Sequence, residues 1–192
     1  RAASLLLRAQ RPIIYTGGGV VLSGAAKQLT TLVERLGHPC TNTLMGLGAL
    51  ASDHPKFLGM LGMHGTYEAN MAMYECDVML AVGARFDDRV TGDLKKFSPN
   101  AKIIHIDIDP ASIGKNVSVE VPIVGDAGAA LEQLLEALEQ TSVEQDTESL
   151  AQWWSQIDAW RGRDSLGYDS SDEVIKPQFV VQKLHEVTLG DA

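Results

Sequence analysis

The chain has 192 residues, of which 45% are hydrophobic, and a formal net charge of −9. Acidic residues outnumber lysine and arginine by 25 to 16, which argues against a nucleic-acid-binding protein because phosphate backbones require a basic face. No apolar run approaches the roughly 20 residues that span a bilayer, which argues against a membrane protein. These limits leave a soluble globular α/β protein.

The cysteines and the start of the chain suggest its setting. Cys40 and Cys76 lie in apolar surroundings and in no CxxC or Cys/His spacing, so we expect free thiols in a reducing compartment, the cytoplasm. The chain begins at Arg1 with neither an initiator methionine nor a signal-peptide pattern. We therefore expect it to belong to a longer polypeptide.

Short apolar runs alternate with helical patterns along most of the chain. In order, these patterns predict a helix at 2–9, a strand at 12–16, a helix at 24–36, strands at 39–42 and 57–61, a helix at 67–76, strands at 78–82, 102–108 and 119–124, and helices at 129–139, 149–163 and 177–187. Ser23 is the expected N-cap of the second helix, and Pro110 begins a short helical turn. This order predicts an α/β, doubly wound, Rossmann-like six-stranded parallel sheet with helices on both faces.

A polar, acidic stretch at 141–148 predicts a linker. We expect a compact domain over residues 1–140, followed over 141–192 by the linker and two helices that pack against something. The first of these helices carries three tryptophans within eight residues. Large aromatic side chains are mostly buried, so we expect the tryptophans to pack against this same domain, with an interface to a partner as the alternative.

The run 78–82 is apolar throughout and predicts a central strand covered on both faces. Four charges follow it within five residues, at Arg85, Asp87, Asp88 and Arg89. Open α/β sheets bind ligands at the carboxyl ends of their strands, so this turn is a candidate site. Two surface ion pairs in a solvated loop are the alternative.

The other strands also end in turns that suit a nucleotide. Glycine-rich segments follow three of them, at 17–19, 43–48 and 62–65, and acids follow two more at Asp107 and Asp126. Glycine amides can hold a diphosphate, an acid can bind ribose hydroxyls, and an arginine can add a charged fork. The spacing is not GxGxxG, and tight turns also require glycine. We expect a dinucleotide along this row of strand ends.

The sequence offers no convincing catalytic group. His64 has no evident serine or cysteine partner, and the other four histidines lie beside prolines or inside predicted elements, so we expect structural roles for all of them. Asp87 and Asp88 are adjacent, and their side chains diverge where acid–base catalysis needs convergence.

Six motifs, in order, extend over most of the chain: TGGG at 16–19, LMGLGAL at 44–50, LGMLGMHGTYEAN at 58–70, VGARFDDRVTG at 82–92, HIDIDP at 105–110 and PIVGDA at 122–127. Together they resemble the central domain of the large catalytic subunit of acetohydroxyacid synthase, also called acetolactate synthase. LGMHGTYEAN and RFDDRVTG are specific to that family. The resemblance implies the middle of three domains, followed by helices that lead toward the thiamine-binding domain.

The resemblance implies FAD in this domain, with no obligatory redox part in the reaction. It places thiamine diphosphate and Mg²⁺ in the flanking domains, so the chain by itself is expected to be inactive. The parent enzyme would condense pyruvate with pyruvate or 2-ketobutyrate, releasing CO₂, in branched-chain amino acid biosynthesis. Its expected partners are its own flanking domains, further copies of itself and a small regulatory subunit.

The flavin contacts follow by matching motifs, and Arg89 is in addition expected to face the channel for substrate and inhibitors. The flavin contacts that the resemblance implies are Gly17, Gly18, Gly19, Thr43, Leu44, Met45, Gly62, Met63, His64, Gly65, Gly83, Arg85, Asp87, Arg89, Val90, Asp107, Ile108, Asp126 and Ala127. Two alternatives remain open. One is the structural central domain of another thiamine diphosphate enzyme, with an empty or different nucleotide site. The other is a sirtuin-like NAD-binding enzyme, although two isolated cysteines exclude its usual four-cysteine zinc module.

Overall fold

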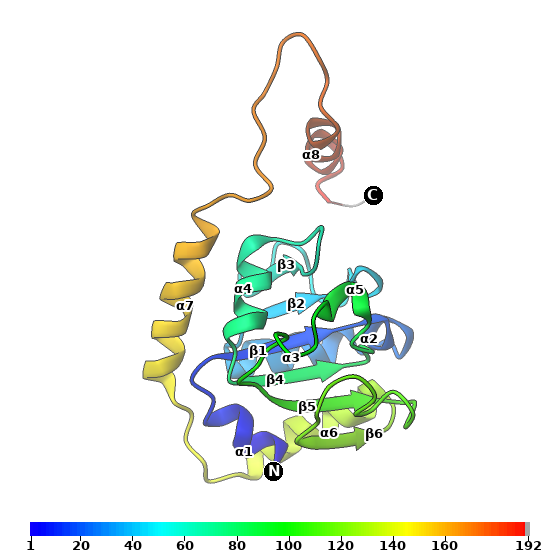
Figure 1. Ribbon diagram of the computed structural model, residues 1–192, viewed down its shortest axis with the longest axis vertical. Helices are drawn as coiled ribbons and strands as arrows, with labels where there is room; N and C mark the ends of the chain where they lie inside the picture. Colours follow the sequence, from blue (N-terminus) through cyan, green and yellow to red (C-terminus); the bar gives the residue numbers. More distant parts are fainter. Residues whose placement is uncertain (191–192) are drawn as a thin grey trace.

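The computed structural model describes residues 1–190 and is built on one six-stranded sheet (Figure 1). The strands are β1 (Pro12–Thr16), β2 (Cys40–Asn42), β3 (Phe57–Met60), β4 (Val78–Val82), β5 (Lys102–Asp107) and β6 (Val121–Val124). Their order across the sheet is β3-β2-β1-β4-β5-β6, and every neighbouring pair is parallel. The predicted doubly wound parallel sheet is confirmed.

Strand β4 is central, as its apolar run predicts. All five of its residues are buried, and Leu80 lies in register between Ile14 of β1 and Ile104 of β5. A strand in this position has no face in water, which explains why its sequence has no polar alternation. The edge strand β6 alternates between half-buried and exposed residues.

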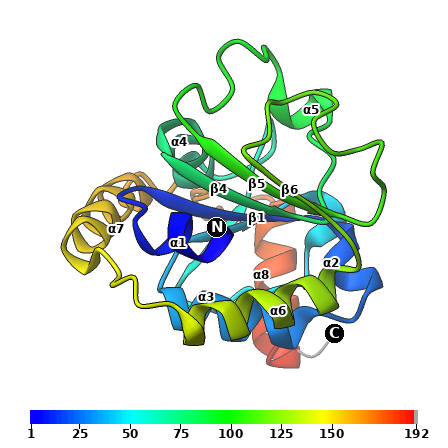
Figure 2. The ribbon, with the colours of Figure 1, turned by 90° about the horizontal axis from the view of Figure 1, so that it is seen from below.

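Helices cover both faces of the sheet (Figure 2). They are α1 (Ala2–Leu7), α2 (Gly18–Leu22), α3 (Ala26–Leu36), α4 (Tyr67–Glu75), α5 (Asp88–Thr91), α6 (Ala127–Gln140), α7 (Thr147–Arg161) and α8 (Pro177–Thr188), with a 3₁₀ turn at Leu44–Gly46. One apolar core joins the sheet to α1, α3 and α6, and a second joins its other face to α4 and α7. No helix within residues 1–190 combines the length and apolarity needed to cross a bilayer.

The prediction around Ser23 is wrong. A short helix, α2, begins within the glycine turn, and Ser23 ends it by donating its hydroxyl proton to the Val20 carbonyl oxygen at 3.1 Å. Gly24 then adopts a φ of 66°, in the left-handed region that a continuing helix cannot use, so α3 starts only at Ala26. The charged turn after β4 also contains a helix, α5, that the sequence analysis did not anticipate.

Helix α7 lies against the sheet. It buries Leu150, Trp153, Ile157 and Trp160, and the Trp153 indole N–H donates to the Pro12 carbonyl oxygen at 3.0 Å. Packing of the tryptophans against this same domain is thus confirmed for Trp153 and Trp160. The helix begins at Thr147, two residues earlier than predicted, because the Asp146 carboxylate accepts the Ser149 amide at 3.0 Å.

Helix α8 differs from α7. It buries none of its residues within the described part of the chain, and Figure 1 shows it away from the sheet, beyond an extended segment. Val180, Val181 and Val187 are each more than half exposed. The expectation that α8 packs against something is therefore not met by residues 1–190.

Candidate functional site

A cavity of about 520 Å³ lies at the carboxyl ends of β1, β4, β5 and β6. This size falls within the range of small-molecule sites. We call it the strand-end cavity. Its lining consists of Gly18, Gly19, Leu22, Ser23, Met45, Gly83, Arg85, Asp107, Ile108, Asp109, Ser112, Gly125, Asp126 and Ala127. The cavity therefore lies along the row of strand ends where the sequence analysis expects a ligand.

Two glycine turns meet at the base of the cavity. A Cβ on Gly19 would lie 2.6 Å from the Gly83 Cα, closer than real Cβ atoms approach, and Gly83 itself has a φ of 59°. The Gly17 amide donates to the Val82 carbonyl oxygen at 2.9 Å and the Gly19 amide to Gly83 at 3.2 Å. Two of the three amides expected to cradle a diphosphate therefore hold the two turns together, and Gly18 is the one without such a backbone bond within residues 1–190.

Carboxylates enter the cavity lining from two strands. Asp107 ends β5, and its Oδ1 accepts the Asp109 amide at 2.9 Å. Asp109 in turn accepts the Ser112 hydroxyl at 3.1 Å. Asp126 follows β6 and caps α6 by accepting the Ala129 amide at 3.0 Å. These local bonds fix the three carboxylates at the strand ends, where they can accept hydroxyl groups from a ligand.

Apolar side chains also line the cavity. Leu22 is 90% exposed, Met45 75% and Ile108 72%. Isolated exposed apolar residues are common, but these three come from α2, from the 3₁₀ turn and from the residue that follows β5, and they share one cavity. Apolar walls beside a few fixed polar groups suit a ligand that carries an aromatic ring system.

The charged turn after β4 forms the start of α5. The Asp87 carboxylate caps this helix by accepting the Arg89 amide at 3.4 Å and lies 3.6 Å from the Arg85 guanidinium. Hydrogen bonding with Asp88, then the Arg89 amide and the charge of Arg85, hold the pKa of Asp87 below its usual value. Arg89 is exposed and forms no ion pair within residues 1–190. The alternative reading expected two surface ion pairs in this turn, and residues 1–190 contain one of them, Arg85 with Asp87.

The loop after β3 lies beside this charged turn. Asn70 holds the loop from both sides, accepting the Gly62 amide at 2.9 Å and donating to the Gly62 carbonyl oxygen at 3.0 Å. A Cβ on Gly62 would lie 3.4 Å from the Arg89 carbonyl oxygen. The loop and α5 are thus in contact. Met63 lies in this loop and is 87% exposed.

The structure divides the predicted site residues into two groups. Nine line the strand-end cavity: Gly18, Gly19, Met45, Gly83, Arg85, Asp107, Ile108, Asp126 and Ala127. The others do not line it: Gly17, Thr43 and Leu44 lie in the turns after β1 and β2, Gly62, Met63, His64 and Gly65 follow β3, and Asp87, Arg89 and Val90 belong to the charged turn. Five lining residues were not predicted as site residues, namely Leu22, Ser23, Asp109, Ser112 and Gly125. The available signal was adjacency in the sequence, because Asp109 and Gly125 directly adjoin the predicted residues Ile108 and Asp126.

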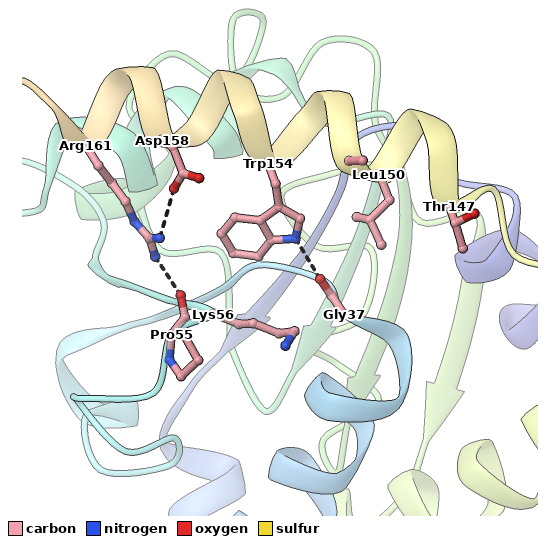
Figure 3. Close-up of a pocket in the computed structure, with 9 residues that line it drawn as sticks. Gly37, Pro55, Lys56, Thr147, Leu150, Trp154, Asp158 and Arg161 are labelled. Carbon is pink, nitrogen blue, oxygen red and sulfur yellow. Dashed lines mark hydrogen bonds and ion pairs between the residues drawn. The ribbon is translucent and has the colours of Figure 1, made fainter.

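A second cavity, also of about 520 Å³, lies under α7 (Figure 3). Gly37, Pro55 and Lys56 line it from the segments that precede β2 and β3, so it flanks the amino ends of the strands. Leu150 and Trp154 line it from α7. None of the predicted site residues lies in it.

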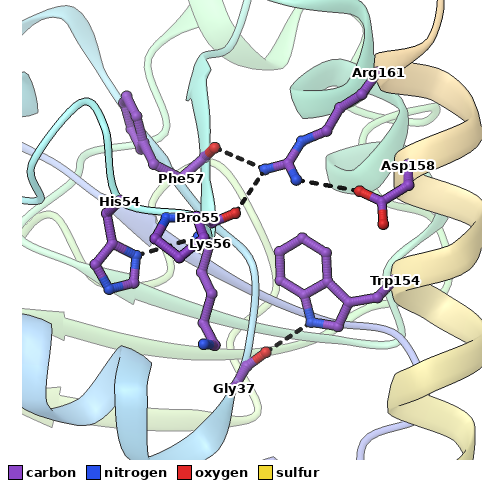
Figure 4. Close-up of polar contacts among 8 residues, drawn as sticks. All are labelled: Gly37, His54, Pro55, Lys56, Phe57, Trp154, Asp158 and Arg161. Carbon is purple, nitrogen blue, oxygen red and sulfur yellow. Dashed lines mark hydrogen bonds and ion pairs between the residues drawn. The ribbon is translucent and has the colours of Figure 1, made fainter.

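Polar contacts around this second cavity tie α7 to the sheet (Figure 4). The Trp154 indole N–H donates to the Gly37 carbonyl oxygen at 2.8 Å. Arg161 donates to the carbonyl oxygens of Pro55 at 3.0 Å and Phe57 at 2.9 Å, and pairs with Asp158 at 3.2 Å. These groups bond to one another, so we interpret the cavity as part of the α7 packing surface.

Two of the histidines, His38 and His105, and both cysteines are buried. Burial lowers the pKa of His38 to about 3 and also lowers that of His105, which keeps both rings neutral. Burial raises the pKa of the Cys40 and Cys76 thiols to about 12, so neither is a ready thiolate. Within residues 1–190, no group of three or more His, Cys, Asp and Glu side chains is arranged to hold a metal ion.

Comparisons with known proteins agree with the motifs. The family model described as "Thiamine pyrophosphate enzyme, central domain" matches residues 1–134. The chain is 52% identical to the acetolactate synthase isozyme 3 large subunit of Escherichia coli and 48% identical to the acetolactate synthase large subunit of Haemophilus influenzae, in each case over all of the chain and 33% of the relative. It is 46% identical to the acetolactate synthase of Mycobacterium leprae, over 100% of the chain and 31% of that protein.

The chain thus spans about a third of the length of the curated relatives it matches. The family match covers the whole sheet and most of α6, which includes every residue of the strand-end cavity. On this evidence the chain belongs to the thiamine pyrophosphate enzyme family, as its central domain.

Proposed function

We propose that the chain is the FAD-binding central domain of an acetolactate synthase large subunit. The observation that carries the proposal is the strand-end cavity, which combines exposed apolar walls, fixed carboxylates and an arginine in a chain similar to these subunits along its whole length. A dinucleotide needs these three kinds of contact.

The residues present fit such a cofactor. Leu22, Met45 and Ile108 would contact the aromatic base, while Asp107 and Asp109 would accept the ribose hydroxyls. The Gly18 amide and Arg85 would face the diphosphate. The flavin ring end would reach the remaining predicted contacts, in the loop after β3 and at the start of α5. FAD would take no obligatory redox part in the reaction.

The proposal extends to the parent protein. It would condense two 2-keto acids with release of CO₂, in the cytoplasm, using thiamine diphosphate and Mg²⁺ held by flanking domains. Residues 1–140 would form the cofactor-binding unit, and residues 141–192 would lead to the thiamine-binding domain. The parent would assemble with further copies of itself and a small regulatory subunit. Arg89, exposed and free of ion pairs within residues 1–190, would face the keto-acid channel.

A flavin titration of this chain tests the proposal. We expect FAD to bind the chain with a micromolar or weaker Kd, measured by the quenching of flavin fluorescence, because the walls that flanking domains supply to the flavin ring are missing here. Arg85→Ala should weaken binding several-fold, whereas Lys56→Ala, which removes a cation from the cavity under α7, should leave the Kd unchanged.

Two outcomes would change the proposal. Nanomolar binding would show that this domain holds the flavin without its neighbours. A full-length subunit that binds no FAD would favour the alternative of a structural central domain with an empty or different nucleotide site.

A further inference from the structure

Two side chains from outside the charged turn hold the backbone on either side of Arg85. His105, in β5, contacts the Ala84 carbonyl oxygen through Nε2 at 2.9 Å. Asn116, in the connection between β5 and β6, donates from Nδ2 to the Phe86 carbonyl oxygen at 2.8 Å. Arg85 is therefore flanked by two hydrogen bonds, one of which anchors the turn to β5 and the other to the connection that follows β5.

The hydrogen bond of His105 has a fixed direction. A carbonyl oxygen only accepts, so Nε2 must carry the ring proton. The ring is fully buried, its Nδ1 has no hydrogen-bond partner within residues 1–190, and the depressed pKa keeps it neutral. His105 is thus held in one tautomer, and its only N–H is directed at the Ala84 carbonyl.

Phe86 adds a constraint on the backbone. Its φ is 51°, in the left-handed region that a bulky residue adopts only when its surroundings enforce it. Its ring is 1% exposed and packs against Tyr15, Phe97 and His105, with ring centroids 5.5, 5.9 and 5.0 Å away. This packing fixes the bend that follows Arg85.

Arg85 itself stays largely in solvent, and its one ion pair within residues 1–190, with Asp87 at 3.6 Å, is also exposed. Its side chain is 75% exposed and lines the strand-end cavity, while the residues before and after it are buried. We propose that His105, Asn116 and Phe86 are positioning residues that hold Arg85 at the edge of the strand-end cavity, so that its guanidinium meets the anionic diphosphate of the ligand. The anchored turn stands on the geometry, and only the identity of the ligand rests on the proposed function.

Anchoring matters because Arg85 is on a turn. When a guanidinium on a mobile turn binds an anion, the backbone of that turn loses conformational freedom, and this loss weakens the complex. A turn already fixed by two hydrogen bonds and a buried ring avoids the loss. Asn116 is not among the residues that line the cavity, so it should affect ligand affinity through the turn that it anchors, and chiefly through Arg85.

The first experiment measures amide hydrogen exchange in the chain without ligand. Asn116→Ala should speed exchange at the amides of residues 85–87 by about threefold to tenfold, the effect of one lost hydrogen bond, with little change in the urea midpoint. Asn100→Ala, an exposed asparagine in the preceding connection, is the matched control and should change nothing. Unchanged exchange in Asn116→Ala would overturn the inference.

A second pair of variants tests the buried anchor. His105→Gln keeps an N–H donor near the position of Nε2 and should retain the exchange rates of the natural chain at residues 85–87, whereas His105→Leu should raise them. Because His105 lies in the core, His105→Leu can also lower the unfolding midpoint; Asn116 lies on the surface, so its variant carries the test if this one fails to fold.

The last experiment is a double-mutant cycle on FAD affinity. Asn116→Ala should weaken FAD binding in the natural chain and have a clearly smaller effect in an Arg85→Ala background, since it acts chiefly through Arg85. Equal effects in both backgrounds would overturn the positioning role. If neither this chain nor a full-length subunit binds FAD, the proposed ligand is wrong, and the exchange experiment still decides whether the turn is anchored.

Discussion

Helices α7 and α8 have similar amphipathic sequences and different positions in the structure. Each carries apolar residues at helical spacing, yet α7 buries Trp153, Ile157 and Trp160 on the sheet while α8 buries nothing within residues 1–190. The difference lies in the contacts that surround the apolar face. The indole and guanidinium groups of α7 donate to the carbonyl oxygens of Pro12, Gly37, Pro55 and Phe57. These four residues lie at the amino ends of the strands or in the segments before them.

This comparison shows what a periodic pattern can and cannot predict. The spacing of apolar residues identifies a face that is stable when covered, but not the surface that covers it. On α7 the same side chains that bury apolar area also carry N–H groups matched to carbonyls of the sheet. On α8 the aromatic residue is Phe179, which has no polar group to match.

The largest expected effect follows from truncating the central tryptophan of α7. Trp153→Ala should destabilise the chain by about 3–5 kcal/mol, because the side chain is 3% exposed and its N–H bond to Pro12 is lost with it. Phe179→Ala in α8, the matched control, should cost within about 0.5 kcal/mol. Urea unfolding measures both, and equal costs would show that α7 and α8 contribute alike.

The next effect is a loss of stability in acid. His38 follows the Gly37 carbonyl that α7 contacts, and its pKa is about 3 when folded against about 6.5 when unfolded. Below pH 6.5 the unfolded chain binds a proton that the folded chain does not, so stability falls as pH decreases toward 3, by up to about 1.4 kcal/mol per pH unit. His105 acts in the same direction.

Urea unfolding at pH 7.5, 6.5, 5.5 and 4.5 checks this prediction. His38→Gln should flatten the pH dependence in this window, and the exposed His64→Gln should leave it as it is. A His38→Gln variant with the full slope would show that other groups cause the acid loss.

The smallest effect is expected from removing α8. A chain ending at Gly167 should have a free energy of unfolding within about 0.5 kcal/mol of that of the full chain, because α8 buries none of its residues within residues 1–190. Ending the chain at Asp146 instead removes α7 together with Trp153 and Ile157, and should expose the apolar residues of the sheet and α4 that share their core. A several-degree fall in Tm on removing α8 alone would contradict the comparison.

Much of the fold could be predicted because the strands are buried on both faces. The bounds of β1 and β4 match their apolar runs, and the ends of the other four differ from prediction by one or two residues. The short helices α2 and α5 escaped prediction for a physical reason. They have five and four residues, too few for an apolar period, and each starts within a turn that glycines or charges dominate.

The location of the candidate site could be predicted, but its detailed roles could not. Parallel strands share one edge for their carboxyl ends, so Asp107, Asp126 and Arg85 were expected to gather there. The sequence could not show that Leu22 would line the cavity, because that depends on the unanticipated helix α2. Nor could it reveal that Asn116 holds the turn of Arg85, since the two are 31 positions apart.

The contact between the turns of β1 and β4 bears on how sequences of this family can diverge. Gly17, Gly19 and Gly83 leave no room for a Cβ because backbone meets backbone there, whatever ligand lies above. A descendant that no longer bound a nucleotide would still have to keep these three glycines in order to fold. Selection for the cofactor would instead be recorded at positions such as Leu22, Met45 and Ile108, which are exposed and free to drift once nothing covers them.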